Sequence, residues 1–481
     1  MNKKEKILIV GAGLCGSLLA LRMAQRGYQV LVYESRSDLR ESDISVGRSI
    51  NLSLSDRGLK ALRMAGVEKK ARELCIPMKG RLMHDDKSNT FESNYSGRSG
   101  ECINSISRGN LNSLLLTEAE KHPNVTIVFN TKCLHIDIEA KTATFESQFS
   151  KQVFKEEASV IFGTDGAGSS LRKSYEKQFS EFSVSQDFLT HGYKELEIPA
   201  DKNGNHIISK EHLHIWPRGD YMLIALPNMD GSFTVTLFLS YSKGLYNFDN
   251  LISEKKIIEF FKKDFPDTLS LIPDILKEFE NNPTGKLGTI KCYPWAYKGN
   301  TLLLGDSSHA IVPFYGQGMN ASFEDVYVLD AVLNQFEGNW STVFSEFQKQ
   351  RKIDTDAIAD LAIDNYFEMR DHVANPSFKE KRMIEMNLEK FFPTQYFSKY
   401  SLVTYNENIA AYPNPANTTL FWKYDESITD VKVYNIRGEL VIASAADQKK
   451  LNTTELKSGL YLVQFYENSE VAKTSKVMIQ H

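Results

Sequence analysis

The chain of 481 residues has few cysteines, no long apolar run and no long run of basic residues. Its five cysteines are scattered, odd in number and without a Cys-x-x-Cys pair, which argues against a disulfide framework and against a zinc site. No apolar run approaches the length of a transmembrane span. The net charge is −4 and the basic residues are dispersed, so no nucleic-acid partner is expected. These features favour a cytoplasmic protein with reduced thiols.

The N-terminal residues have the pattern of a first strand and not of an export signal. The segment MNKKEKILIVGAG is basic, but its apolar stretch is only a few residues long and runs directly into glycines. We therefore expect no signal peptide here. At this length the chain should contain two or three domains.

The order of periodic patterns predicts an α/β protein followed by a small all-β module. KILIV (6–10) and YQVLVYES (28–35) enclose a helical pattern, which together make one βαβ unit. β patterns dominate from about 188 to 240, and long helices dominate from the end of the 305–320 segment to about residue 400. Over 406–481, short β runs alternate with turn signals. Further expected elements are a helix at 108–123, strands near 125–129, 133–138 and 142–146, and helices at 253–263 and 273–280.

Gly11, Gly13 and Gly16 form a GxGxxG motif between the first strand and the first helix. The first glycine permits a tight turn, the second lets the backbone approach a pyrophosphate, and the third packs the helix on the strand. The helix N-terminus favours the phosphate charge. Glu34 ends the second strand, where it can accept a hydrogen bond from a ribose hydroxyl. The motif predicts a dinucleotide site but does not separate FAD from NAD; the alternative is a strand–helix turn without a ligand.

Two later segments repeat the pattern of an apolar strand followed by a glycine–aspartate turn. GTDGAGSSLR (163–172) contains Asp165, and LLLGDSSHA (302–310) contains Asp306. Either segment alone is also compatible with a tight turn capped by an aspartate. In this order, the three segments resemble the flavoprotein aromatic hydroxylases, which are single-component FAD monooxygenases. The resemblance implies that Asp306 binds the ribityl chain of FAD and that Asp165 lies near the cofactor, in a segment linked to nicotinamide nucleotide use.

Ser307, Ser308 and His309 are residue types found in hydrolase sites, but the chain has no GxSxG motif. The sequence assigns no partner acid to His309, which is interpreted as a packed or hydrogen-bonded histidine. GQGMN (316–320) instead opens a helix, and its backbone N–H groups can face a flavin ring or a phosphate.

Four longer motifs narrow the resemblance to the kynurenine 3-monooxygenase family. They are GRSINLSLSDRG (47–58), NPTGKLGTIKCYPW (282–295), GDSSHAIVPFYGQGMNASFED (305–325) and NYFEMRD (365–371). The resemblance implies hydroxylation of L-kynurenine to 3-hydroxykynurenine, with FAD as cofactor and NADPH and O₂ as co-substrates. It implies no catalytic side chain and no metal, because the flavin carries the chemistry.

The resemblance also implies a Rossmann-like FAD-binding domain with an interleaved β-sheet substrate domain and C-terminal helices. The β runs of the last residues add a small all-β tail module. The expected FAD-binding segments are about 1–75, 100–185 and 285–335. The expected substrate-domain segments are about 76–99 and 186–284, followed by a helical segment at 336–405 and a β-sandwich-like tail at 406–481.

Arg81 and Tyr95 match the family residues that hold the carboxylate of the substrate. RLMHDDKSNTFESNY (81–95) reads as a hairpin, and a turn centred on Ser88 would place Arg81 and Tyr95 opposite each other. A guanidinium beside a phenol suits a carboxylate. Without the resemblance, a surface arginine packed on a tyrosine is the simpler interpretation.

The resemblance assigns further residues to the substrate and to the flavin. Asn365 matches a family residue whose side-chain amide binds the amino-acid end of the substrate. Asn365 and Met369 are four residues apart and therefore share one helix face. Arg108 matches a family position that contacts the flavin. The alternative is that Arg108 is a charged residue at the start of a helix, with no role in flavin binding. The other matched positions are Tyr400, Phe238, Phe314 and Tyr315 for the substrate, and Leu134, Gly318, Met319 and Asn320 for the flavin.

The tail carries a different resemblance. YPNPANTT (412–419), VYNIRGELV (433–441) and LKSGLYLVQF (456–465) resemble the C-terminal sorting domain of bacterial type IX secretion. A cofactor enzyme that uses NADPH is nevertheless expected in the cytoplasm. Two alternatives stay open: a related flavin hydroxylase acting on another amino-aromatic acid, and an exported or surface binding protein with an inactive flavin fold.

Overall fold

The computed structural model describes residues 5–41, 51–98, 100–336, 338–367, 376–393, 396–405, 419–422, 428–435, 437–445, 450–467 and 470–479. The chain forms two compact units. The first consists of Met1–Ser93 and Cys102–Asn375, and the second of Asn94–Glu101 and Pro376–His481.

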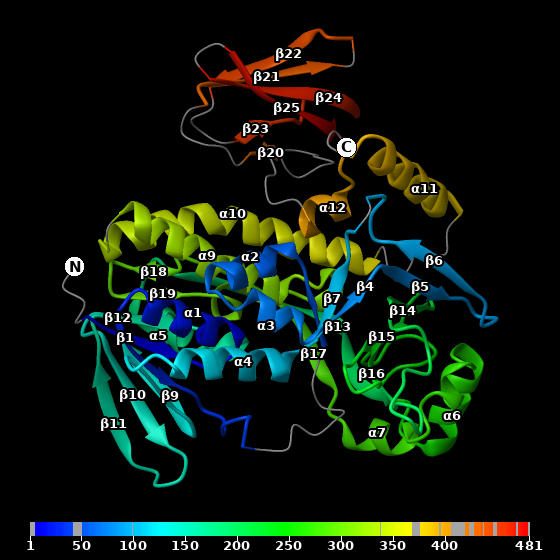
Figure 1. Ribbon diagram of the computed structural model, residues 1–481, viewed down its shortest axis with the longest axis horizontal. Coiled ribbons are helices and arrows are strands. Elements are labelled where there is room, and N and C mark those ends of the chain that lie inside the picture. The colour runs from blue at the N-terminus through cyan, green and yellow to red at the C-terminus, as the bar shows by residue number, and fades with distance from the viewer. Residues whose placement is uncertain are drawn as a thin grey trace. The chain divides into compact units, whose positions relative to one another are not determined.

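A six-stranded sheet in the order β18-β19-β12-β1-β2-β8 forms the centre of the first unit (Figure 1). Its strands from β19 to β8 are parallel, and β18 pairs antiparallel with β19. The apolar run KILIV becomes the central strand β1 and is buried after its first residue, as expected for a parallel strand covered on both faces. The strands are β1 Lys6–Val10, β2 Gln29–Tyr33, β8 Val125–Val128, β12 Val160–Gly163, β18 Ala296–Tyr297 and β19 Thr301–Leu303.

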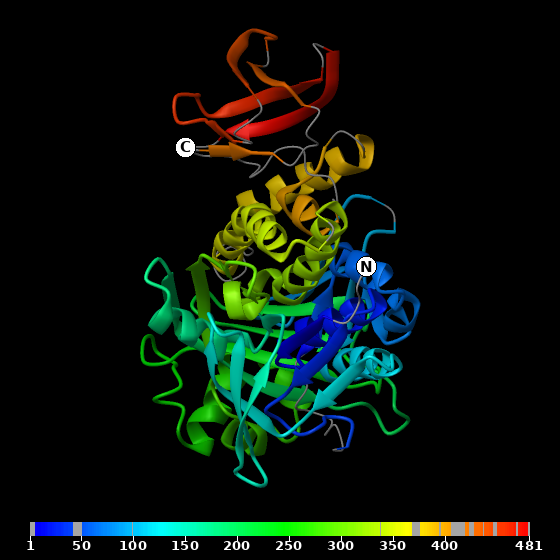
Figure 2. The same cartoon turned by 90° about the vertical axis from the view of Figure 1, so that its left-hand side faces the viewer.

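The helices of this unit pack around the parallel sheet. α1 is buried on nearly every face because it lies against β2, α4 and α9. α9 and α10 run side by side in both views (Figure 1, Figure 2). The helices are α1 Leu14–Gln25, α2 Asp56–Met64, α3 Glu68–Arg72, α4 Arg108–Glu120, α5 Ser170–Gln178, α8 Asp306–His309, α9 Gly318–Gln335 and α10 Trp340–Phe367, with 3₁₀ turns η1 Gly166–Gly168 and η3 Pro313–Tyr315.

A second sheet of seven strands has the order β17-β13-β16-β15-β14-β5-β6. The pairs from β17 to β14 are antiparallel, and β14 pairs parallel with β5. Its core contains Trp216, Phe233 and Phe260 and is separate from the core of the parallel sheet. The elements are β5 Gly80–His84, β6 Thr90–Asn94, β13 Ser183–Ile198, β14 His212–Pro217, β15 Met222–Pro227, β16 Phe233–Ser240, β17 Gly285–Tyr293, α6 Glu254–Asp264, η2 Thr268–Ser270 and α7 Ile275–Asn281.

Two smaller sheets complete the first unit. One has the order β3-β7-β4 and is tied to the seven-stranded sheet by Asn51, whose side chain donates to the carbonyl oxygen of Pro227 at 2.9 Å. The other has the order β11-β10-β9. The strands are β3 Asn51–Leu54, β4 Cys75–Met78, β7 Ile103–Ser107, β9 Thr131–Asp137, β10 Thr142–Ser147 and β11 Val153–Glu157.

The described residues of the second unit form two helices and a small β module. A four-stranded antiparallel sheet in the order β22-β21-β24-β25 and a β20–β23 pair enclose a core that includes Trp422, Val463 and Phe465. The elements are α11 Pro376–Phe391, α12 Lys399–Thr404, β20 Thr419–Phe421, β21 Asp430–Asn435, β22 Leu440–Ala445, β23 Lys450–Asn452, β24 Gly459–Glu467 and β25 Glu470–Ile479.

The expected fold class is confirmed, and the differences concern strands with weak patterns. β13 begins at Ser183, before the β region expected from about 188, and β11 was not expected. The first half of β13 is largely exposed and polar, so its apolar alternation is weak. Its pairing with β17, about a hundred residues later in the chain, defines this half as a strand. None of the helices in the described residues has both the length and the apolar composition needed to cross a lipid bilayer.

Candidate active site

The first glycine turn is built from positions where a side chain does not fit. Gly11 has φ +98°, and a Cβ there would lie 2.7 Å from the carbonyl oxygen of Thr164. A Cβ on Gly16 would lie 1.9 Å from the carbonyl oxygen of Gly11. Both glycines are therefore required by the close packing of α1 on β1 and β12.

Gly13 has a different reason to be glycine, because the space beside it is open. A Cβ at this position would meet no heavy atom of the described residues within 4 Å. Gly13 is the N-cap of α1, and no side chain of the described residues caps this end of the helix. The first-turn N–H groups and the helix dipole therefore form a cradle for an anion. The turn fits the pyrophosphate of a dinucleotide.

Glu34 follows β2 and folds back onto this turn. Its Oε2 accepts a hydrogen bond from the Ala12 backbone N–H at 2.8 Å, and its Oε1 accepts from the Arg36 side chain at 2.9 Å. Burial alone would raise the pKa of Glu34, but the hydrogen bonds and charge of Arg36 lower it below the ordinary value. The carboxylate thus stays ionised and keeps acceptor capacity for a ribose hydroxyl.

The structure brings the three glycine turns of the sequence together. The ideal Cβ position of Gly11 lies 2.8 Å from Cα of Asp165, which follows β12. The turn after β19 also lies against α1, because the ideal Cβ position of Gly305 lies 3.2 Å from Sγ of Cys15 in α1. The carboxyl ends of neighbouring parallel strands thus meet at the start of α1, which is where open α/β sheets bind dinucleotides.

Asp165 and Asp306 have different environments in these turns. Oδ2 of Asp165 accepts from the backbone N–H of Ser170 at 2.6 Å, as a capping aspartate at α5 would. Its Oδ1 is buried without a hydrogen-bond partner among the described residues, and burial raises the pKa of Asp165. Asp306, at the first turn of α8, is exposed. Its carboxylate is accessible to a polyol chain such as the ribityl group.

Arg172 is a structural residue of this region that the sequence motifs did not identify. It is 2% exposed, and its guanidinium donates to the carbonyl oxygen of Ser307 at 2.8 Å and to that of Ala167. These bonds tie the Asp165 turn to the Asp306 turn. Ser307 itself donates its hydroxyl to the Gly163 carbonyl oxygen at 2.6 Å, so it is engaged as a structural group and not as a nucleophile.

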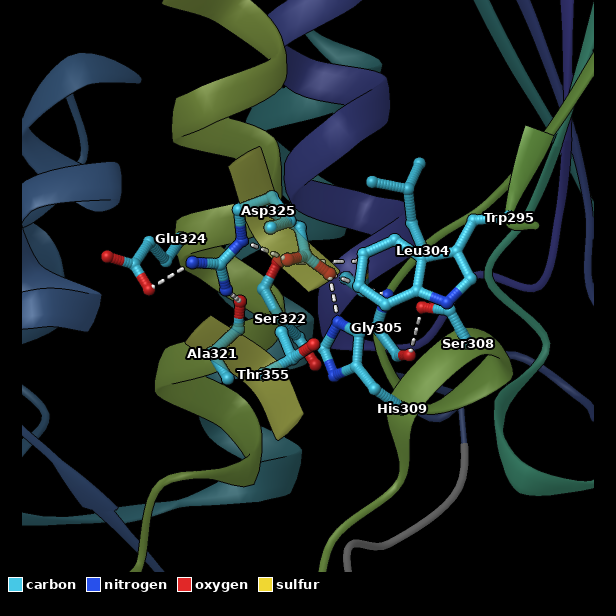
Figure 3. A network of polar contacts seen from close by, with 12 residues as sticks. Trp295, Leu304, Gly305, Ser308, His309, Ala321, Ser322, Glu324, Asp325 and Thr355 are labelled. Atoms are coloured by element: carbon cyan, nitrogen blue, oxygen red, sulfur yellow. Dashed lines mark hydrogen bonds and ion pairs between the residues drawn. The ribbon is translucent and has the colours of Figure 1, made fainter. Parts of the chain in front are cut away.

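His309 is hydrogen-bonded, as expected, and the structure supplies the acid that the sequence did not assign. Its Nε2 lies 2.6 Å from Oδ2 of Asp325 in α9, and its ring packs against Trp295 (Figure 3). The same Asp325 oxygen accepts from the Gly305 backbone N–H at 2.9 Å. The other oxygen accepts from Nε of Arg351 in α10 at 2.8 Å. Asp325 therefore joins the Gly305 turn to the two long helices.

The charges of this network keep Asp325 ionised although it is fully buried. Burial alone would raise the pKa of Asp325, but His309 and Arg351 hold it below its ordinary value. Arg351 is also paired with Glu324 at 2.6 Å. His309 is thus committed to a buried ion-pair network, and its 3% exposure leaves it no access to a substrate.

Three of the expected substrate residues of the first unit lie together. The rings of Phe238 in β16 and Phe314 in η3 have centroids 4.9 Å apart. The Asn365 side chain in α10 donates to the carbonyl oxygen of Phe314 at 2.6 Å. Tyr366, which the sequence motifs did not single out, packs on Phe314 at 4.2 Å. Tyr315 is also buried, and Met369 lies outside the described residues.

The carboxylate-binding candidates are distributed over both units. Arg81 lies in β5 of the first unit, opposite Leu213 of β14, and the hairpin of β5 and β6 turns at residues 85–89 with φ +64° at Ser88. In the second unit, Tyr95 and Tyr400 stack with centroids 5.4 Å apart and ring planes 8° apart. Two tyrosines that are distant in the sequence thus form one aromatic pair.

The remaining flavin candidates occupy helix starts and a sheet surface. Arg108 is exposed at the first turn of α4, and Leu134 of β9 is 43% exposed. Gly318, Met319 and Asn320 begin α9. The Asn320 side chain points away from solvent and donates to the carbonyl oxygen of Ser53 at 2.8 Å, so only its backbone remains for a cofactor.

Comparisons with known proteins agree with this geometry. Residues 4–341 match the family described as FAD binding domain, and residues 410–480 match the secretion system C-terminal sorting domain. A kynurenine 3-monooxygenase of Myxococcus xanthus is 44% identical over 404 residues, which cover 84% of this chain and 86% of that protein. One of Dictyostelium discoideum is 42% identical over 465 residues, covering 93% of this chain and 98% of that protein.

Solved structures show the same fold at low sequence identity. The tetrameric form of 2-methyl-3-hydroxypyridine-5-carboxylic acid oxygenase superposes with a TM-score of 0.63 at 19% identity. The superposition covers 82% of this chain and 99% of that one.

The two outer glycines of the motif and the middle one should respond differently to substitution. Gly16→Ala places a methyl group against backbone and should lower the free energy of unfolding by about 1–3 kcal/mol. Gly13→Ala fills open space at an ordinary φ of −68°, so the apoprotein should keep its stability while FAD affinity falls by roughly tenfold or more. Thermal unfolding of the apoprotein and fluorescence titration with FAD measure the two effects. Unchanged FAD affinity in Gly13→Ala would contradict the assignment of the cradle.

Proposed function

Because the chain belongs to the kynurenine 3-monooxygenase family, we propose that it hydroxylates L-kynurenine to 3-hydroxykynurenine, with FAD as cofactor and NADPH and O₂ as co-substrates. The observation that carries this proposal is the 42–44% identity over at least 84% of the chain. The family match over residues 4–341 spans the glycine turns and Phe314. The open space at Gly13 and the exposed Asp306 fit a bound FAD.

Bound FAD supplies the redox chemistry, in which NADPH provides two electrons and one atom of O₂ enters the aromatic ring. The protein residues then have to orient the ring and exclude water. Phe238 and Phe314 form an apolar wall for this purpose. The ring amine of kynurenine already donates electrons to the carbon beside it, so no protein base is needed to activate the ring. His309 is hydrogen-bonded to the buried Asp325, which agrees with a mechanism that uses no protein base.

Arg81, Tyr95, Tyr400 and Asn365 are proposed to hold the amino-acid end of the substrate. A guanidinium presents two parallel N–H donors to a carboxylate, and a phenol adds a third. The stacking of Tyr95 on Tyr400 supports a shared role for these two rings.

The direct test is NADPH oxidation by the purified yellow protein with and without L-kynurenine, followed by mass spectrometry of the product. The expected result is a substrate-stimulated rate and a product heavier by one oxygen atom. Stimulated oxidation that yields only hydrogen peroxide would mean that kynurenine binds without productive hydroxylation. Turnover of anthranilate or of a phenolic acid, without turnover of L-kynurenine, would assign a different aromatic substrate. A purified protein that retains no FAD would refute the assignment as a flavin-dependent enzyme.

Arg81→Ala should raise the KM for L-kynurenine by about 10- to 100-fold, because hydrogen bonds to charged groups contribute roughly 1.5–3 kcal/mol. FAD content should stay at the wild-type level. Lys79→Ala is a matched control, since Lys79 is an exposed cation just before the same strand and pairs only at the surface with Glu211. A KM for Arg81→Ala equal to that of the control would refute the role in carboxylate binding.

We further propose a cytoplasmic location, where NADPH is available as reductant. All five cysteines are free, which agrees with a reducing compartment. The sorting-domain match of residues 410–480 favours export instead, so the two features make opposite predictions. Fractionation of the native cells with an antibody to the protein should place it with cytoplasmic marker enzymes. Recovery from the cell surface or the medium would overturn this location.

A further inference from the structure

Glu389 of α11 is a fully buried carboxylate that binds two distant segments of the chain. It has 0% exposure. Its Oε2 accepts a hydrogen bond from the backbone N–H of Gly97 at 3.0 Å. Its Oε1 accepts from the backbone N–H of Ser398 at 2.9 Å, and Ser398 is the N-cap of α12. One side chain therefore joins the segment after β6 to the start of α12.

Arg98 reinforces this junction from the Gly97 side. Its guanidinium lies 3.4 Å from Oε1 of Glu389 and donates from Nε to the carbonyl oxygen of Pro393 at 2.9 Å. It also donates to the carbonyl oxygen of Tyr396 and lies over the ring of Phe397, 4.0 Å from its centroid. The buried negative charge of Glu389 is thus compensated by a cation as well as by backbone donors.

The junction lies immediately beside the two stacked tyrosines. Tyr95 precedes Gly97 by two residues, and Tyr400 follows Ser398 by two residues. Each ring therefore stands two residues from a backbone N–H that Glu389 binds. Arg382, on the same helix as Glu389, donates to the carbonyl oxygen of Tyr95 at 2.6 Å. The backbone on both sides of the aromatic pair is held by α11.

The charge of Glu389 matters for this arrangement. Burial alone would raise its pKa, but hydrogen bonds from the Ser401 side chain and from the Gly97 and Ser398 segments lower the pKa below the ordinary value. The ionised carboxylate offers two acceptor oxygens to donors on opposite sides. A glutamine would replace one oxygen by an NH₂ group, which would face a backbone N–H and lose that hydrogen bond.

We propose that Glu389 is a positioning residue for substrate binding, which holds Tyr95 and Tyr400 in their stacked arrangement by joining their two backbone segments. The inference rests on the proposed function, in which these tyrosines bind the amino-acid end of kynurenine. Glu389 acts through these two tyrosines in the proposal, because its two oxygens bind the backbone N–H groups of Gly97 and Ser398. Its loss should therefore act on substrate affinity and leave flavin binding intact.

The experiment compares Glu389→Gln and Glu389→Asp with the control Glu380→Gln, which changes an exposed glutamate of the same helix. Hydrogen–deuterium exchange of the segments 94–101 and 396–405 measures the junction without any substrate. Steady-state kinetics measure KM and kcat for L-kynurenine, and FAD absorbance measures cofactor content. In Glu389→Gln, exchange at Gly97 and Ser398 should become at least tenfold faster, and KM should rise at least tenfold. The value of kcat at saturation should stay within twofold of wild type, and Glu389→Asp should recover part of the loss.

Faster exchange with an unchanged KM would overturn the proposal, because the junction would then be structural only. Unchanged exchange would overturn it as well. If Glu389→Gln does not yield folded protein, Arg98→Lys weakens the same junction, and an unchanged KM in that variant would refute the positioning role. A wild-type protein that does not turn over kynurenine would refute the proposed function, and the exchange data would still report whether Glu389 joins the two segments.

Discussion

In the first unit, the packing of the Gly305 turn against α9 and α10 depends on one buried carboxylate, that of Asp325. A fully buried charge is costly unless it is paired and hydrogen-bonded, and removal of one partner from such a pair costs about 3–5 kcal/mol. Asp325 meets this requirement with the Gly305 N–H, His309 and Arg351. Gly305 and His309 belong to the turn and the short helix after β19, and Arg351 belongs to α10, the helix that also carries Asn365. Asp325 thereby holds together the elements that are proposed to face the cofactor and the substrate.

In the second unit, a buried carboxylate likewise joins segments that are distant in the sequence. Glu389 binds two backbone N–H groups with its two oxygens, as Asp325 binds donors from separate elements. In both cases a carboxylate inside the protein forces chain segments that are distant in sequence to meet. A site that orders a substrate and excludes water needs binding residues that are held in place by the side chains around them.

Local features such as turns and hairpins could be predicted from the sequence, whereas hydrogen-bond partners on distant elements could not. A hairpin of β5 and β6 and a hydrogen-bonded His309 were both predicted and are confirmed. The predicted pairing of Arg81 with Tyr95 is not confirmed, because the Asp85 N–H donates to the Asn89 carbonyl oxygen and β6 ends at Asn94, before Tyr95. Asp325 was not recognised as the partner of His309 although it stands in the same quoted motif, because an acid sixteen residues away has no periodic relation to a histidine on another element. Arg172 was missed for the same reason, since its acceptors are carbonyl groups of other turns. The roles assigned to individual substrate and flavin residues stay predictions.

Features that depend on local sterics and on family resemblance can be predicted from the amino-acid sequence alone. Gly11 and Gly16 are required wherever a helix packs this closely on a strand, and the order of glycine turns identifies the flavin fold. The partners of the buried charges are known only from the folded chain, as is the stacking of Tyr95 on Tyr400 across some three hundred residues of sequence. The physical reason is that a glycine turn is specified by its own backbone and immediate neighbours. A buried ion pair is specified by the packing of entire elements, and no short segment contains that information.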